Sequence, residues 1–480
     1  MRGKKESFIY LFTKILMGLI GIVSVGIQTK YISPAALGDF SLITGFTGVL
    51  VSVFASWIGS SGLRYYHQYY HEKKENEFYS TLMLDWLVMF GLICLTALIG
   101  GWIFTSIPIR QYLSFVLVML FWCSLWEIYE KLMRASNHNT VYCLILLMQS
   151  ILNLAIIILY YKATSKEIES LFLAKILTIC LSIIIIIIVL RVWKYIKIRQ
   201  YSWELNKVFF NYGFPMVGVW GVSWLLNYSD RYIINYFLAN TQVGLYDVAY
   251  RFAESSIGMV ISAFNLAFFP AMIRTWNEEG KEAACRMTRS IFNYFFMFAI
   301  PAFLGIALLA NQFYGTIIDE QYQEAAVVMS ISSIGFIFMG INNMLYKLWQ
   351  LEEKTKMVLY LTIMSVLVNI TTNIIFIPLF GYIAAAATTV VSYVLTTIVI
   401  VFLIRRHFHL SIDIKTVLKQ LVSGAAMSVF ILVFRRMVNG TFMLFLCIMI
   451  GALVYFMVLA LQGGLKNEIQ EIKAMLRKKV

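Results

Sequence analysis

Charged residues are scarce in this sequence. They make up 13% of its 480 residues, whereas 60% are hydrophobic before glycine is counted. Ordinary soluble domains are roughly 45–50% apolar, with about a quarter of their residues charged. A water-soluble fold of this length has no way to bury so much apolar side chain. The composition therefore excludes a soluble protein and indicates one that is embedded in lipid.

Further absences narrow the class of function. Six cysteines stand singly, with no CxxC pair and no Cys/His cluster, and no GxxxxGK[ST] loop is present. The first absence excludes a disulfide framework and a zinc site, and the second excludes an ATP-driven pump within this chain. A membrane-embedded glycosyltransferase or polymerase would need a large extramembrane loop with catalytic carboxylates, which is also missing. We expect a protein that is not an enzyme and uses no cofactor or metal.

Long apolar stretches fill the chain. A membrane-spanning helix needs about 20 mostly apolar residues. Fourteen stretches meet this need, over 8–29, 40–62, 79–105, 112–133, 140–161, 169–190, 208–237, 244–272, 287–310, 323–346, 357–378, 382–404, 416–434 and 441–462. They leave no room for a separate soluble domain. The sequence predicts an all-α integral membrane protein with 14 transmembrane helices.

Basic residues distinguish the two sides of the membrane. With the N-terminus inside, the cytoplasmic segments carry 29 of the 39 Lys and Arg residues and the opposite side carries six. Such a bias marks the cytoplasmic face of a membrane protein. It also accounts for the net charge of +14 without a nucleic-acid partner. We predict that both termini are cytoplasmic.

The two halves of the chain resemble each other weakly. The turn over 33–40 resembles the turn over 239–246 at an offset of 206, and each places a glycine two residues before an aromatic residue. This repeat predicts two pseudo-symmetric six-helix lobes plus two extra C-terminal helices. The segments are 1–200 for the N-terminal lobe, 201–410 for the C-terminal lobe, and 411–480 for the extra helices and a basic cytoplasmic tail. Parallel repeats place the working site between lobes, although membrane hairpins in general also look alike.

Ionisable residues within spans are costly and normally face a cavity or each other. Asp230 and Arg231 precede one short outer turn, and Asp247 and Arg251 follow it. In one interpretation these four form a buried ion-pair lattice that joins two helices. In the other, the arginines line a water-filled cavity and meet an anionic group. Lys14 has no acidic residue near it in the sequence, which favours the cavity.

Three other features lie at helix ends. Arg64 follows a run of small residues, which permit close helix approach or a hinge. In one interpretation Arg64 lies at the cytoplasmic mouth of the cavity and controls entry to it. In the other it is an ordinary basic residue of the cytoplasmic face. Lys175 is expected to lie near the outer interface and to reach it with its long side chain. Glu127 and Glu130 lie near a cytoplasmic end, where helix capping or pairing with Lys131 is expected.

Four segments together resemble a known superfamily. They are Tyr31-Ile32-Ser33-Pro34 through Gly38-Asp39-Phe40, Tyr228-Ser229-Asp230-Arg231-Tyr232 running to Val243-Gly244-Leu245-Tyr246, Phe268-Phe269-Pro270, and Ile377-Pro378-Leu379-Phe380-Gly381-Tyr382. Over nearly its whole length the chain resembles polysaccharide flippases, the Wzx-like branch of the multidrug/oligosaccharidyl-lipid/polysaccharide exporter superfamily.

The resemblance implies a mechanism and a substrate. It implies two lobes around a cationic central cavity, with alternating access, in the bacterial cytoplasmic (inner) membrane. The implied substrate is an undecaprenyl-diphosphate-linked oligosaccharide repeat unit of an O-antigen or capsule, and the implied partners are membrane lipids and a polymerase or glycosyltransferases. The cavity cations would be Lys14, Arg64, Arg231 and Arg251, and the acids for coupling to H⁺ or Na⁺ would be Asp230, Asp247 or Glu254.

Two other transporters share the predicted architecture. A lipid II flippase has the same fourteen helices and a cationic cavity, and is the closer alternative. A multidrug and toxin extrusion antiporter exports organic cations and should have an acidic cavity. Four spanning cations against about four acids do not favour such a cation trap.

Overall fold

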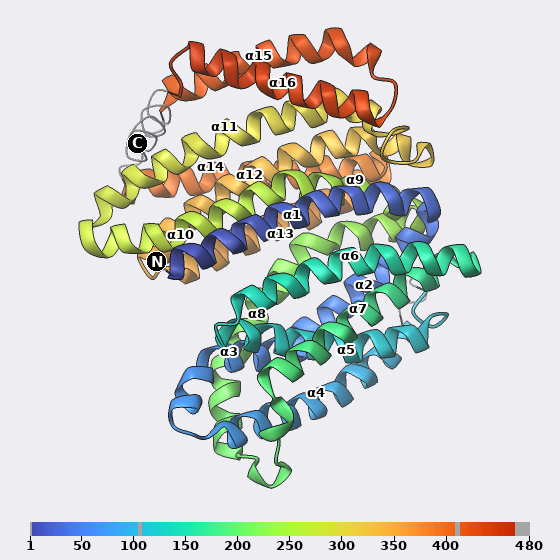
Figure 1. Ribbon diagram of the computed structural model, residues 1–480, viewed down its shortest axis with the longest axis vertical. Coiled ribbons are helices and arrows are strands. Elements are labelled where there is room, and N and C mark those ends of the chain that lie inside the picture. Colours follow the sequence, from blue (N-terminus) through green and yellow to red (C-terminus); the bar gives the residue numbers. More distant parts are fainter. Residues whose placement is uncertain (1, 104–107, 409–412, 466–480) are drawn as a thin grey trace, which may run out of the picture. The chain divides into compact units, whose positions relative to one another are not determined.

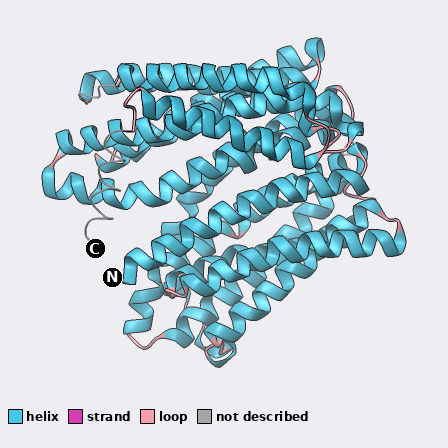
Figure 2. Cartoon of the chain, turned by 45° about the horizontal axis from the view of Figure 1, so that its top comes forward, coloured by secondary structure: helices cyan, strands magenta, loops and turns pink. Residues whose placement is uncertain are grey.

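The structure is a computed structural model that describes residues 2–103, 108–408 and 413–465, with side chains from residue 12 onward except those of residues 266 and 267. These residues are almost all helical (Figures 1 and 2). The long helices are α1 (Arg2–Tyr31), α2 (Pro34–Phe54), α3 (Ser56–His71), α4 (Glu75–Ile103), α5 (Leu113–Ala135), α6 (Asn139–Thr164), α7 (Glu167–Leu190), α8 (Trp203–Phe237), α9 (Asn240–Ala253), α10 (Met259–Glu279), α11 (Lys281–Phe313), α12 (Ala326–Leu351), α13 (Thr355–Phe380), α14 (Tyr382–His407), α15 (Ile414–Phe434) and α16 (Thr441–Leu461).

The predicted fold class is confirmed: the chain is an all-α integral membrane protein. Within the described residues, 13 helices are long and apolar enough to cross a membrane, and each overlaps one of the predicted spans. The remaining predicted span, 208–237, lies in α8, which is 35 residues long. Asn, Ser and Tyr residues and the Asp230–Arg231 pair interrupt the apolar sequence of α8.

Two predicted helices are interrupted. The second begins earlier than expected, at Pro34, where the hydroxyl of Ser33 caps it by accepting a hydrogen bond from the Ala36 N–H at 3.4 Å. Proline suits this first position because its nitrogen has no hydrogen to leave unpaired. The helix then breaks at Ala55, between α2 and α3. The eighth predicted helix contains the π-helical turn Glu254–Gly258 between α9 and α10, which rotates the residues beyond it relative to a continuous α-helix.

Contacts divide the chain into two compact units. The first contains the described residues of Met1–Asp247 and Thr362–Ala385, and the second those of Val248–Leu361 and Ala386–Val480. In the first unit α3 packs against α5 and α8, and α6 against α1 and α7; in the second, α11 packs against α10, α12 and α15. The division differs from the predicted segments because α8 and much of α13 join the first unit. The six-helix lobes therefore stay a prediction.

Small residues bring α3 close to its neighbours, as the sequence predicts for the run before Arg64. The hydroxyl of Ser61 donates to the Phe209 carbonyl oxygen of α8 at 2.7 Å. A Cβ on Gly213 of α8 would lie 2.3 Å from the Trp57 carbonyl oxygen, and one on Gly59 would lie 2.6 Å from the Glu127 carbonyl oxygen of α5. Lipid is as apolar as a helix surface, so helices in membranes associate through such close packing and polar contacts.

Candidate functional site

A buried ion pair joins α8 to α9. Arg231 and Asp247 are 4% and 2% exposed, and the Arg231 Nε lies 2.8 Å from the Asp247 Oδ1. The Arg231 Nη1 donates to the Asn227 carbonyl oxygen at 2.6 Å, and the guanidinium lies over the Tyr228 ring, 5.0 Å from its centroid. Charge, hydrogen bonds and an aromatic face thus fix the position of this arginine.

The neighbouring carboxylate, Asp230, joins α8 to α9 and α13. The Tyr246 hydroxyl donates to its Oδ2 at 2.6 Å, and the Asn373 Nδ2 donates to its Oδ1 at 2.6 Å. Asn373 also donates to the Asn369 Oδ1 at 3.1 Å, and the Ser229 hydroxyl reaches the same oxygen at 3.4 Å. All five side chains belong to the first unit. The network explains why a segment as distant in sequence as α13 joins that unit.

The α8–α9 residues of the sequence analysis are thus partly brought together. The Arg231–Asp247 contact is the kind of pairing that the ion-pair interpretation predicts. Arg251 lies one turn further along α9 and is half-buried, whereas Glu254 opens the π-helical turn and is exposed. Their proposed roles toward an anion or a coupling ion stay predictions.

The two other predicted cations lie apart from this network. Lys14 is a half-buried residue of α1, and Arg64 is an exposed residue of α3, about two turns before its end at His71. Neither forms an ion pair with any described side chain. Within the first unit, no hydrogen bond or ion pair joins Lys14, Arg64 and Arg231. A shared site for the three cations therefore stays a prediction.

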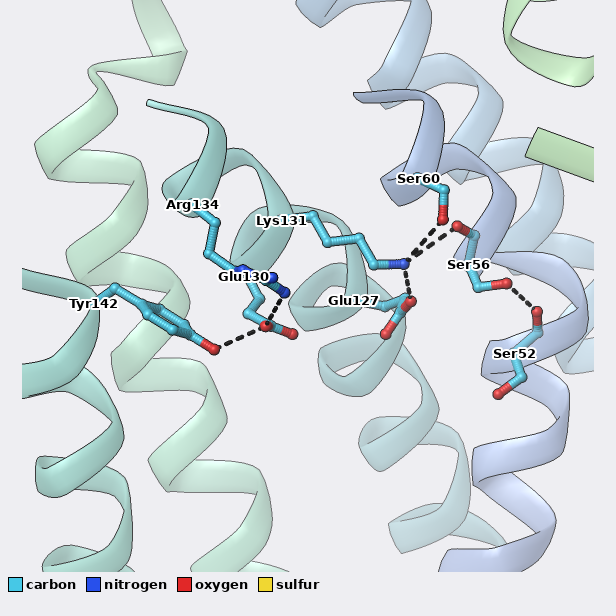
Figure 3. Close-up of polar contacts among 8 residues, drawn as sticks. All are labelled: Ser52, Ser56, Ser60, Glu127, Glu130, Lys131, Arg134 and Tyr142. Carbon is cyan, nitrogen blue, oxygen red and sulfur yellow. Dashed lines mark hydrogen bonds and ion pairs between the residues drawn. The ribbon is translucent and has the colours of Figure 1, made fainter. Parts of the chain in front are cut away.

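Lys131 is the centre of a second polar cluster, between α3 and α5 (Figure 3). Its ammonium group lies 2.5 Å from the Glu127 Oε1 and donates to the Ser60 hydroxyl at 3.2 Å and to the Ser56 carbonyl oxygen at 3.4 Å. It also lies 5.2 Å from the centre of the Trp220 ring of α8. The predicted pairing of Lys131 with Glu127 is confirmed.

Glu130, three residues further along α5 than Glu127, has different partners (Figure 3). Its Oε1 accepts a hydrogen bond from the Tyr142 hydroxyl of α6 at 2.8 Å and lies 3.5 Å from the Arg134 Nη1. Glu127 and Glu130 therefore link α5 to two different neighbours. The contacts of both glutamates are to residues of the first unit. Among the described side chains, no group of three His, Cys, Asp or Glu residues is placed to hold a metal ion.

The two similar turns over 33–40 and 239–246 pack against each other through their glycines. A Cβ on Gly38 would lie 1.9 Å from the Asn240 carbonyl oxygen, and a Cβ on Gly244 would lie 1.8 Å from the Pro34 carbonyl oxygen. The amide of Asn240 also donates to the Asp39 Oδ1 at 2.9 Å. Only glycine permits such a close approach of two backbones. This contact joins the starts of α2 and α9.

Known proteins resemble this chain in sequence over part of its length. The family described as polysaccharide biosynthesis protein matches residues 4–276, more than half of the chain. The probable low-salt glycan biosynthesis flippase Agl15 of Haloferax volcanii is 26% identical over 273 residues, which are 54% of this chain and 55% of that protein. The chain thus spans about half the length of the curated relatives it matches.

Solved structures share the fold over a longer stretch. The lipid II flippase MurJ in an inward closed conformation matches 97% of this chain and 99% of that chain, with a TM-score of 0.74 and 17% identity. An inward-facing multidrug resistance MATE family transporter of the MOP superfamily matches 82% of this chain and 97% of that chain, with a TM-score of 0.68 and 13% identity. At these identities the likeness shows the fold alone.

Proposed function

The chain belongs to the polysaccharide biosynthesis protein family, and from this premise we propose that it is a flippase for a lipid-linked oligosaccharide. The proposed substrate is an undecaprenyl-diphosphate-linked repeat unit of a surface polysaccharide. It is moved by alternating access from the inner to the outer leaflet of the bacterial cytoplasmic membrane. Both termini are cytoplasmic in this proposal, and glycosyltransferases and a polymerase act before and after the transport step.

The position of Lys14 carries the proposal. It lies in the apolar part of α1, is half-buried, and forms no ion pair with a described side chain. A lysine within the membrane costs at least about 2.5 kcal/mol unless it meets water or an anion. A diphosphate that crosses ~30 Å of hydrocarbon needs such a cation, and the lipid tail remains in the bilayer.

The other cations take different parts in this proposal. Arg64, exposed on α3, attracts the diphosphate at the cytoplasmic mouth, and Arg251 of α9 meets it within the membrane. Arg231 already donates to Asp247 and to the Asn227 carbonyl oxygen. We therefore assign it chiefly to positioning α8 against α9.

The coupling ion is the remaining part of the proposal. Asp247 is paired with Arg231 at 2.8 Å, and binding a coupling ion there would break this buried pair. Asp230 and Glu254 are then the better acids for exchange of a proton or sodium ion. A gradient of either ion would supply the free energy, because the chain has no nucleotide-binding loop.

Transport in proteoliposomes tests the proposal. The purified full chain is reconstituted with a fluorescent undecaprenyl-diphosphate oligosaccharide or, in parallel, with fluorescent lipid II, and a membrane-impermeant quencher reports the leaflet. We expect transport of the oligosaccharide lipid, its loss in Lys14→Met, and partial retention in Lys14→Arg. Lys162→Met, which neutralises an exposed lysine at the end of α6, is the matched control.

The outcomes separate the alternatives. Transport of lipid II alone would replace the proposed substrate by the peptidoglycan precursor. Equal transport by Lys14→Met and the unchanged chain would show that Lys14 does not meet the diphosphate. Export of an organic cation instead of either lipid would make the protein a multidrug antiporter.

A further inference from the structure

A partly open cavity lies within the first unit and is lined by residues of α1, α5, α6 and α7. Its volume is about 410 Å³. The side chains that matter for its chemistry are Ser24, Trp126, Gln149, Asn153, Lys175 and Thr178. It shares no residue with the Arg231–Asp247 pair, the Asp230 network or the Lys131 cluster.

The cavity lies deep in the membrane. Lys175 is about 12 Å along α7 from Glu167, and Gln149 is about 22 Å along α6 from Thr164, at 1.5 Å per residue. Both distances are measured from the predicted outer ends of the helices. With a hydrocarbon core of ~30 Å, these side chains lie around its middle.

Lys175 lines this cavity, which the sequence did not predict. Its side chain forms no ion pair with any described residue. An ammonium group at this depth normally faces a water-filled space or an anion. The cavity provides the space, and none of its lining residues is an Asp or Glu.

The amides opposite are hydrogen-bond donors without acceptors. Gln149 and Asn153 are four residues apart, so they lie on one face of α6. The Gln149 Nε2 is buried and has no hydrogen-bond partner, although a buried amide normally finds one. Asn153 also makes no side-chain hydrogen bond to any described residue. A ligand that accepts hydrogen bonds would satisfy both.

We propose that this cavity binds an oxyanion, a phosphate or a carboxylate. The Lys175 ammonium supplies the positive charge, Gln149 and Asn153 donate from α6, and Ser24 donates from α1. The Thr178 hydroxyl donates to the Ala174 carbonyl oxygen at 2.7 Å, so it contributes shape and not a donor. The oxyanion belongs either to a lipid headgroup or to a small soluble anion. Neither source requires the protein to be a flippase.

A cysteine in the cavity wall makes the charge measurable. Cys123 of α5 lines the same cavity. The test uses a variant that keeps Cys123 and has the other five cysteines replaced by alanine. Its Cys123 is modified by an anionic and, separately, by a cationic methanethiosulfonate. Each modification rate is divided by the rate of the same reagent with a free thiol in solution, and the two quotients are compared. A nearby positive charge should raise this anionic-to-cationic ratio by about five- to tenfold.

The ratio should fall to near one in Lys175→Met and persist in Lys175→Arg. Lys162→Met is the matched control, because it removes a positive charge from the end of α6 outside the cavity. A chain that keeps only Cys94 of α4, which does not line the cavity, should show no dependence on Lys175. Lys175→Gln gives the same neutralisation if the methionine variant does not reach the membrane.

Protection of Cys123 identifies the source of the oxyanion. Inorganic phosphate or glucuronate is added to the protein in detergent, and nanodiscs of phosphatidylglycerol are compared with nanodiscs of phosphatidylcholine. Slower modification with a soluble anion indicates a small-anion site, and slower modification only in phosphatidylglycerol indicates a lipid headgroup. The inference is wrong if no anion protects Cys123, or if the ratio is the same in Lys175→Met and the unchanged chain.

Discussion

Gly38 and Gly244 occupy reciprocal positions in the contact between the turns over 33–40 and 239–246. The Gly38 Cα faces the Asn240 carbonyl oxygen, and the Gly244 Cα faces the Pro34 carbonyl oxygen. The offset of 206 that relates the two turns in the sequence converts Pro34 into Asn240 and Gly38 into Gly244. Each contact is therefore the image of the other. Such reciprocity is the property of a twofold interface, and it supports the internal repeat.

We predict that a single methyl group at either glycine separates the turns. In Gly38→Ala and Gly244→Ala the new Cβ meets backbone oxygen at 1.9 and 1.8 Å, and the backbone cannot rotate away as a side chain would. Overpacking of this kind costs about 1–3 kcal/mol, so the detergent-solubilised protein should lose its monodisperse chromatographic peak at a lower temperature. Gly91→Ala, with nothing within 4 Å of its Cβ, should behave like the unchanged chain. Equal melting of all variants would contradict the contact.

A second prediction concerns the buried ion pair. Removing one partner, in Arg231→Met or Asp247→Leu, leaves the other charge buried and should cost about 3–5 kcal/mol. The double variant removes both charges and should be more stable than either single variant. Thermal unfolding of the four proteins completes a double-mutant cycle. Simple addition of the two losses would show that Arg231 and Asp247 do not depend on each other.

The third prediction compares two lysine–glutamate pairs that differ in burial. The Lys131 side chain is 8% exposed in its pair with Glu127, whereas Lys354 is 49% exposed in its pair with Glu352. Exposed pairs contribute about 0–1 kcal/mol. Lys131→Met should therefore lower the unfolding temperature clearly more than Lys354→Met. A loss of equal size in both would mean that Ser56, Ser60 and Trp220 do not stabilise the Lys131 cluster.

The fourth prediction is a pH dependence at the start of α15. Hydrogen bonds from the Thr416 side chain and backbone, followed by the Arg289 charge, hold the pKa of Asp413 below its usual value. A lowered pKa stabilises the folded protein above the unfolded value of about 3.9. This contribution is lost as the pH falls through the folded pKa. Asp413→Asn should thus be less stable than the unchanged chain at pH 7, with the difference vanishing toward pH 3. A difference that stays constant from pH 7 to pH 3 would exclude this role.

Local patterns in the sequence were sufficient for many of these features. Thirteen spans follow from apolar length alone. The Lys131–Glu127 pair follows from a spacing of four residues on one helix, and the close approach of α3 follows from its small residues. Each of these features is set by residues that are close together in the sequence, so a periodic sequence pattern predicts it.

Other features depend on contacts between distant segments and were not predicted. The helix break at Ala55 has no proline or glycine at that position from which it could be predicted. The bond from Asn373 to Asp230 places part of α13 in the first unit, and no property of Asn373 identifies its partner. The cavity beside Lys175 was not predicted because residues of four helices form it, and the hydropathy of a single helix does not record how helices pack.

The hydrogen bond between Asp230 and Asn373 also has a consequence for biosynthesis. The two residues are 143 positions apart, and a ribosome adds about 5–20 residues per second. Asp230 is thus synthesised some 7–29 s before Asn373. During that interval the first unit is only partly assembled, and the Asp230 carboxylate lacks the hydrogen bond that the Asn373 amide will later donate. Accessory factors that shelter unfinished helices would act at this stage, and a ribosomal pause between the two residues would prolong the need for them.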